Sequence, residues 1–172
     1  MTRALVVYES MYGNTHRVAE AIGRGLADQA EVTVVPVSKA TPQLVYDADL
    51  LVVGGPTHAH SMSRPTTRKS AVDGAAKKPE SLTLDADCAG QGVREWLASM
   101  DRTTVHAAAF DTRFAGPSLV MGQASRGIAK VLRGRGCHLI AKRQSFFVEK
   151  GNRLVADEDI RAETWGRELV KT

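Results

Sequence analysis

The chain alternates between short apolar runs and longer segments in which apolar residues recur at helical spacing. The apolar runs are rich in β-branched residues and have the length of strands. Five strands are predicted, at residues 4–8, 31–37, 49–55, 104–110 and 137–141, and the last continues or restarts through residues 145–148. The run at 49–55 is apolar throughout, which is typical of a strand covered on both faces in a parallel sheet.

Helical segments separate these strands. Val93, Trp96, Leu97 and Met100 fall at positions i, i+3, i+4 and i+7 of one segment, which predicts an amphipathic helix. The other helices are predicted at residues 14–28, at 65–78, around Ile128, Val131 and Leu132, and from Asp157 to near Lys171. Strands that alternate with helices predict an α/β fold. We expect a single domain over residues 1–172, with a doubly wound five-stranded parallel sheet and helices on both faces.

The connection after the first strand carries the most distinctive residues of the chain. Glu9 ends the apolar run, and Val18, Ile22 and Leu26 then mark a helix. Between them lies a short polar loop of Ser10, Met11, Tyr12, Gly13, Asn14 and Thr15. Unpaired amides at a helix start, polar side chains and a glycine favour the binding of a phosphate. The alternative is an ordinary capped helix start with no ligand.

Two other phosphate-binding motifs are missing from the sequence. No G-x-x-x-x-G-K-[ST] pattern occurs, which excludes the P-loop that holds Mg-ATP or Mg-GTP. The dinucleotide pattern G-x-G-x-x-G is also missing, and Gly134-Arg135-Gly136 precedes a predicted strand instead of following one.

The loop at residues 10–15 resembles the phosphate loop of the flavodoxin family, which is rich in Ser and Thr, contains glycine and follows the first strand. The resemblance covers nearly the whole chain, because later segments also fall where a flavodoxin has them. It implies FMN as the cofactor, with its phosphate at residues 10–15, and a sheet of order 2-1-3-4-5. In such a sheet, ligands bind beyond the carboxyl ends of the first and third strands.

The resemblance implies that a second loop contacts the flavin ring. Its candidate cofactor-binding residues are Pro56, Thr57, His58, Ala59 and His60. Flavodoxins often place a Trp or Tyr in this loop, and here only the two histidines offer a ring. His58-x-His60 also suggests a metal site, but no carboxylate or Cys at suitable spacing completes a set of ligands, so no metal is expected.

A third loop follows the fourth strand, where the family packs the other face of the ring. The resemblance makes cofactor-binding candidates of Phe110, Asp111, Thr112, Arg113, Phe114 and Gly116. Phe114 is the best stacking candidate, while core packing is the alternative for both phenylalanines. Arg113, together with Arg64 after the second loop, is placed to favour negative charge on a reduced flavin. The sequence singles out no catalytic residue.

Charge and cysteine content narrow the choice of partners. The chain of 172 residues has 23 Lys and Arg against 19 Asp and Glu, a formal charge of +4, whereas flavodoxins are usually acidic. The surplus is not gathered into one long basic tract, so no nucleic-acid partner is expected. No apolar run reaches membrane-spanning length, and no signal pattern opens the chain. Cys88 and Cys137 lie far apart, and we expect a cytoplasmic protein.

Three functions are consistent with these features. The first is an FMN-binding protein that carries electrons between a reductase and an acceptor protein. The second is an FMN-dependent NAD(P)H:quinone-type oxidoreductase, which reduces a small molecule and is favoured by the basic balance and the two loop histidines. The third is a flavodoxin-fold binding module without flavin, for which the unusual second and third loops are the only argument.

Overall fold

The computed structural model describes residues 1–171. Its strands are β1 (Thr2–Tyr8), β2 (Ala30–Pro36), β3 (Leu50–His58), β4 (Ser61–Met62), β5 (His106–Phe114), β6 (His138–Leu139), β7 (Gln144–Glu149) and β8 (Arg153–Leu154). Its helices are α1 (Asn14–Leu26), the 3₁₀ turn η1 (Val37–Lys39), α2 (Pro42–Asp47), α3 (Pro65–Lys77), α4 (Val93–Ser99), α5 (Ser118–Met121), α6 (Ala124–Gly134) and α7 (Glu158–Leu169).

The central sheet has the order β2-β1-β3-β5-β7-β8. All neighbours from β2 to β7 are parallel, and β8 folds back antiparallel on β7. The predicted fifth strand is present as two pieces, β6 and β7, which both pair with β5 and are separated by residues 140–143. The predicted order 2-1-3-4-5 is therefore confirmed, with a short hairpin strand added at one edge.

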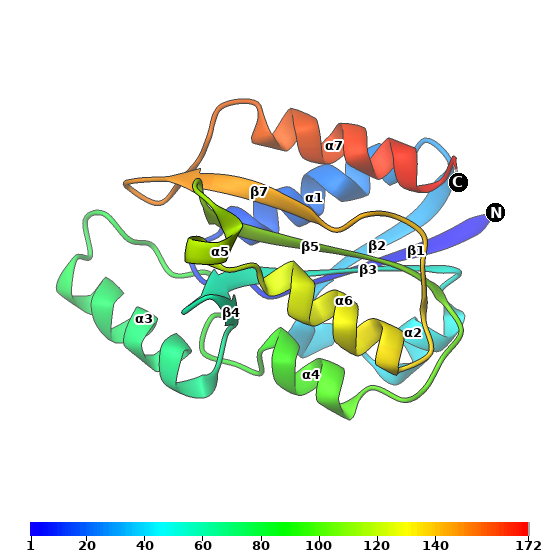
Figure 1. Cartoon of the computed structure of the whole chain (residues 1–172), viewed down its shortest axis with the longest axis horizontal. Helices are drawn as coiled ribbons and strands as arrows, with labels where there is room; N and C mark the ends of the chain where they lie inside the picture. The colour runs from blue at the N-terminus through cyan, green and yellow to red at the C-terminus, as the bar shows by residue number, and fades with distance from the viewer. Residues whose placement is uncertain (172) are drawn as a thin grey trace.

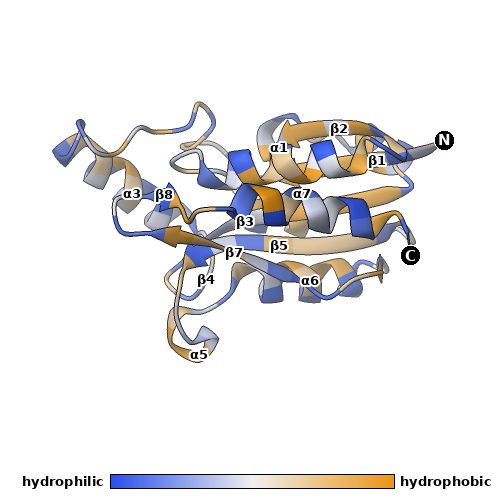
Figure 2. Ribbon diagram, turned by 90° about the horizontal axis from the view of Figure 1, so that it is seen from above, coloured by the Kyte–Doolittle hydropathy of each residue, from blue (hydrophilic) through white to orange (hydrophobic). Residues whose placement is uncertain are grey.

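Helices cover both faces of the sheet, as the alternation of elements predicted. Helices α1 and α7 lie together on one face, and α2, α4 and α6 lie on the other (Figure 1). In the hydropathy view, apolar residues dominate the strands in the middle, while polar residues lie on the outer sides of the helices (Figure 2). The chain therefore buries two apolar layers, one on each side of the sheet.

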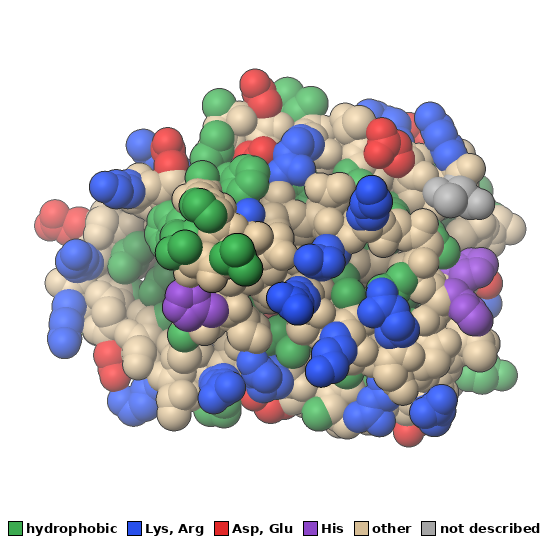
Figure 3. All heavy atoms as spheres, in the orientation of Figure 1, with side chains coloured by type: hydrophobic (Ala, Val, Ile, Leu, Met, Phe, Trp, Pro, Cys, Tyr) green, Lys and Arg blue, Asp and Glu red, His purple; other side chains and the backbone are tan. Residues whose placement is uncertain are grey.

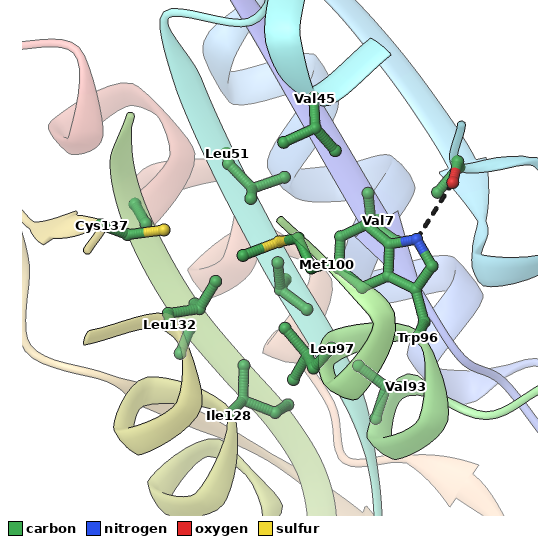
Figure 4. Packing of buried hydrophobic residues seen from close by; sticks show 14 of the residues in the cluster. Val7, Val45, Leu51, Val93, Trp96, Leu97, Met100, Ile128, Leu132 and Cys137 are labelled. Atoms are coloured by element: carbon green, nitrogen blue, oxygen red, sulfur yellow. Dashed lines mark hydrogen bonds between the residues drawn. The ribbon is translucent and has the colours of Figure 1, made fainter. Parts of the chain in front are cut away.

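The layer under α4 contains the residues whose helical spacing was read from the sequence. Val93 and Leu97 are fully buried, and Trp96 packs among them with its indole nitrogen donating to the Ala40 carbonyl oxygen at 3.0 Å (Figure 4). That bond satisfies the one polar group of the buried ring. Trp165 on α7 is likewise buried in the other layer, as predicted.

Two strands run further than the sequence indicated. The starts of the predicted second and third loops belong to β3 and β5. Thr57 and His58 of β3 pair with β4, and Thr112 to Phe114 of β5 pair with β7. Helices α2 and α5 were not predicted, since six and four residues are too few for a helical period to show.

Among residues 1–171, every helix is too short or too polar to span a membrane.

Candidate flavin site

The central strands end at the left side of Figure 1. A cavity of about 150 Å³ opens beyond these carboxyl ends. It is lined by Met11, Tyr12, Asn14, Thr15, Pro56, Thr57, His58, Thr112, Arg113, Phe114, Val148 and Asn152. All but the last two belong to the three segments that the sequence singled out. The parallel sheet brings these segments together because the carboxyl ends of its strands share one edge.

The first helix begins without a side-chain cap. Gly13 precedes α1 with φ +89°, its amide donates to the Ser10 hydroxyl oxygen at 3.1 Å, and no acidic residue occupies the first helical turn. Apart from its chain neighbours, no described residue has an atom within 4 Å of the place where a Cβ on Gly13 would stand. An anion can therefore take the place of the missing cap, at the positive end of the helix dipole. This observation argues against an ordinary capped helix start.

The loop itself is held rigidly by contacts to other segments. The Thr15 hydroxyl is buried and bonded to the Thr112 hydroxyl at 2.7 Å, and the Tyr12 hydroxyl donates to the Ala71 carbonyl oxygen at 3.0 Å. Met11 is buried, and its carbonyl oxygen accepts from the Asp85 amide at 2.8 Å. The backbone is thus fixed before any ligand arrives, which lowers the entropy lost on binding.

The turn between β7 and β8 contributes a part of the site that sequence reasoning missed. The Asn14 side-chain amide donates to both the backbone and the side-chain oxygen of Asn152, each at 3.0 Å. Gly151 and Asn152 adopt φ values of +94° and +59°. A Gly-Asn pair between strand-like segments is a hairpin signal that the sequence did contain. What places this hairpin over the first loop is the pairing of β7 with β5 at the sheet edge.

The second segment of the candidate site, residues 56–60, lies partly in the cavity wall and partly in solvent. His58 is half-buried in the cavity wall, and burial, followed by the charge of Arg68, holds the pKa of its imidazole below 6.5, so the ring is neutral at pH 7. Ala59 and His60 are exposed, have φ of +44° and +73°, and form the turn into β4. Neither lines the cavity, whereas Pro56, Thr57 and His58 of the same segment do.

The third segment of the candidate site, residues 110–116, lies partly at the cavity and partly in the protein interior. Phe114 is half exposed at the rim, and Arg113 is held by bonds from its guanidinium to the carbonyl oxygens of Phe114 and Gly116, at 3.2 and 2.9 Å. Phe110, by contrast, is fully buried, with its ring edge-on to Phe146 and Trp165. The core-packing alternative thus describes Phe110 correctly, and its side chain lies away from the cavity.

Asp111 also lies inside the protein. Its carboxylate is fully buried and accepts from the Ser125 amide at the start of α6, at 2.7 Å, while its other oxygen has no partner among the described residues. Burial raises the pKa of this carboxyl above its usual 3.8, opposed by the hydrogen bonds of Ser125. Its side chain positions α6 and does not line the cavity, and neither does Gly116.

A buried polar network supports the second segment from below. Glu9, at the end of β1, accepts from the Ser63 hydroxyl and from the Val93 amide at 2.8 Å. Arg68 donates to the Ser63 oxygen at 2.9 Å and pairs with Glu95 at 2.9 Å. Burial raises the pKa of Glu9, against these hydrogen bonds. The network ties the starts of α3 and α4 to the sheet, and the carboxylate directly after an apolar run was its signal in the sequence.

Comparison with known proteins agrees with this geometry. The family model for flavodoxins matches residues 6–110 of the chain. The chain belongs to the flavodoxin family. The family binds FMN and transfers electrons, and the chain is accordingly an FMN-binding flavodoxin-like redox protein. No curated protein matches the sequence.

Solved structures show the same fold at low identity. An archaeal flavodoxin matches with a TM-score of 0.66 and 20% identity, covering 99% of this chain and 97% of its own. Oxidised flavodoxin 1 from Bacillus cereus matches with a TM-score of 0.67 and 17% identity, covering 99% and 98%. The flavodiiron protein from Giardia intestinalis matches with a TM-score of 0.63 and 20% identity over 99% of this flavodoxin-like chain, but over 36% of its own length.

The residues of the cavity fit the phosphate end of FMN better than any metal. The uncapped start of α1, the open space beside Gly13 and the polar groups of the loop suit a dianion. Within residues 1–171, no group of three or more His, Cys, Asp or Glu is arranged to hold a metal ion. The cavity is smaller than the ~300–1,000 Å³ of sites that enclose a ligand of drug size, so it does not enclose a group as large as FMN.

Proposed function

We propose that this flavodoxin-family protein carries electrons between a reductase and an acceptor protein through FMN bound at the rim of the sheet. The observation that carries the proposal is the N-terminus of α1, which has no side-chain cap and no acidic residue in its first turn, beside the open space at Gly13. When bound, FMN supplies the electron-transfer chemistry, and the protein supplies binding, orientation and charge.

Each segment of the cavity has a separate task in this proposal. The amides at the start of α1 and the Ser10 hydroxyl hold the phosphate, and the contact of Asn14 with Asn152 keeps the β7–β8 turn closed over it. Phe114 offers an exposed aromatic face for the ring, and His58 offers a neutral one. Arg113 places a positive charge at the rim, where it favours the negative charge of the reduced cofactor.

The shape of the site supports an electron carrier over an enzyme with its own small-molecule substrate. A shallow cavity that leaves the ring edge exposed suits transfer to a protein that docks against the rim. The free, buried thiols of Cys88 and Cys137 fit the reducing cytoplasm that we propose as the compartment.

The phosphate anchor is tested by comparing FMN with riboflavin. We expect purified protein to quench FMN fluorescence with at least a hundredfold lower Kd than riboflavin, because only FMN carries the dianion. The affinity for FMN should also fall when inorganic phosphate is added, while that for riboflavin should not. Equal affinities for the two flavins would contradict the phosphate role of residues 10–15.

The carrier role is tested by steady-state assay with FMN-loaded protein. We expect no sustained oxidation of NADH or NADPH with a quinone unless a separate reductase is added. Rapid turnover without any partner protein would instead assign the protein as an NAD(P)H:quinone-type oxidoreductase. Failure to bind either flavin would leave the flavin-free binding module.

A further inference from the structure

The positive charge of this protein comes from one part of the chain. Residues 102–148 hold eight Lys and Arg against a single acid, Asp111, which is fully buried. The rest of the chain has fifteen Lys and Arg against eighteen Asp and Glu. Without this segment the net charge would be negative, as in the acidic members of the family.

The fold gathers these charges onto one surface, although they form no continuous basic tract in the sequence. Six of the side chains are exposed and define what we call the basic face: Arg102, Arg126, Lys130, Arg133, Lys142 and Arg143. They come from α6, from the segment before β5 and from the segment between β6 and β7. Figure 3 shows Lys and Arg side chains spread over this face of the molecule.

The basic face differs from the opposite side of the sheet in how its cations are paired. Within residues 1–171, none of its six side chains forms a salt bridge. On the opposite side of the sheet, by contrast, Arg24, Arg161 and Arg167 each pair with an acidic side chain. Unpaired like charges at this density repel one another and favour a partner that brings negative charge.

The face is hollowed where the fifth strand breaks. A cavity of about 620 Å³ lies between α6 and residues 139–143, and its wall includes Arg133, Lys142 and Arg143. Small residues on the sheet and on α6, Ala109 and Ala129, form part of its floor. Acidic side chains of a partner can therefore enter the face and reach several cations at once.

An apolar projection adjoins the basic face beside the flavin site. On α5, Leu119 and Val120 are 95% and 62% exposed, and Phe114 at the rim is 50% exposed. Figure 2 shows α5 projecting from the body of the molecule, and Figure 3 shows a group of apolar side chains beside basic ones on the same face as Figure 1. An apolar centre flanked by charge is the composition of a protein–protein interface, which favours a protein partner over a nucleic acid.

We propose that the α5 projection and the basic face together dock a partner protein with an acidic surface. Acidic side chains of the partner pair with the basic face, while an apolar patch on it covers Leu119 and Val120 beside the cofactor rim. The inference rests on the proposed carrier function for its purpose, because docking there brings the partner against Phe114 and the exposed ring edge. The positive charge of this docking surface is the reverse of that expected for an acidic flavodoxin.

The test measures binding and electron transfer with two probe haem proteins. Cytochrome b5, which is acidic, and cytochrome c, which is basic, are titrated by surface plasmon resonance onto the immobilised protein, with and without FMN, at 20 and 300 mM NaCl. We expect cytochrome b5 to bind at low salt and to weaken at least about tenfold at high salt, with cytochrome c showing no such binding. Dithionite-reduced, FMN-loaded protein should reduce cytochrome b5 with the same salt dependence.

Two charge-matched variants localise the effect. Lys130→Glu combined with Arg133→Glu and Lys142→Glu changes the basic face, while Lys39→Glu combined with Lys77→Glu and Lys78→Glu changes exposed lysines elsewhere by the same net charge. The first variant should lose binding of cytochrome b5 by at least about tenfold and keep FMN binding, and the second should lose much less. Leu119→Ser should weaken binding at both salt concentrations.

Three results would overturn the inference. They are equal losses in the two charge variants, a preference for cytochrome c, and tighter binding of duplex DNA than of cytochrome b5. Because the binding arm also uses protein without FMN, a protein that takes up no flavin would refute the carrier function while still deciding whether this surface docks an acidic protein.

Discussion

Gly13 illustrates how the conformation of single residues prepares the site. Its φ of +89° is a left-handed backbone that glycine adopts freely and other L-residues adopt at a cost. Because the space beside it is open, any cost of a side chain there is conformational and not steric. Asp111 illustrates the other kind of special residue, a buried carboxylate with one oxygen left without a partner.

We predict that Gly13→Ala lowers the free energy of unfolding by about 1–2 kcal/mol, the cost of a left-handed L-residue. The matched control is Gly74→Ala, inside α3, where a Cβ also meets nothing within 4 Å but the backbone is helical. That substitution should stabilise the protein by up to about 1 kcal/mol. The measurement is urea unfolding of both variants. Equal changes in the free energy of unfolding would show that a side chain on the residue before α1 does not strain the loop.

Asp111→Asn is predicted to stabilise the protein in a pH-dependent way. Because burial raises the pKa of Asp111 above 3.8, the folded state holds the proton more tightly than the unfolded chain. Stability is therefore lost as the pH rises above 3.8 through the folded pKa, and asparagine does not titrate. The gain over wild type should grow from pH 4 upward and then level off at about 1 kcal/mol. Unfolding midpoints across pH 4–8 measure this, and a constant difference would contradict it.

At the scale of elements, helices α1 and α7 approach each other closely. A Cβ on Gly25 would stand 2.0 Å from the Glu163 carbonyl oxygen, and one on Gly166 would stand 2.4 Å from the Ile22 carbonyl oxygen. Neither helix can move without disturbing the sheet beneath it. Glycine on both helices therefore sets the distance between them, which the helical periodicity of either segment does not predict.

Gly166→Ala should destabilise the protein by about 1–3 kcal/mol, because the new methyl group meets backbone that cannot rotate away. Gly134→Ala, at the end of α6, is the control, since a Cβ there has open space. Thermal unfolding of both variants provides the comparison. If Gly166→Ala melts at the wild-type temperature, the two helices are not packed as closely as described.

Over the whole molecule, the charges are segregated. The basic face carries unpaired cations on one side, and arginines paired with acids cover α1 and α7 on the other. Such a surface favours association with an opposite charge at the cost of repulsion within the protein itself. The sequence indicated a mild surplus of positive charge without a long basic tract. It did not predict the basic face, because residues 102 and 143 become neighbours of α6 only after folding.

Relief of this repulsion is measurable without any partner. The variant with Lys130→Glu and Lys142→Glu, which keeps Arg133 in the last turn of α6, should be more stable than wild type by about 0.5–1 kcal/mol at 10 mM salt, and the difference should shrink at 500 mM. Urea unfolding at the two salt concentrations is the measurement. A variant that is less stable than wild type at low salt would show that these cations have favourable partners.

The order of strands and helices and the three segments of the site were readable from residue types, because strand and helix periods and a polar loop before a helix are local properties. Whether a residue faces the cavity is not a local property of the sequence. Phe110 and Asp111 lie in one strand with Thr112 and Arg113, but the side chains of the first two are covered by α7 on one face and by α6 on the other. Asn152 and the basic face depend on contacts between residues far apart in the chain, and only the assembled sheet brings these residues together.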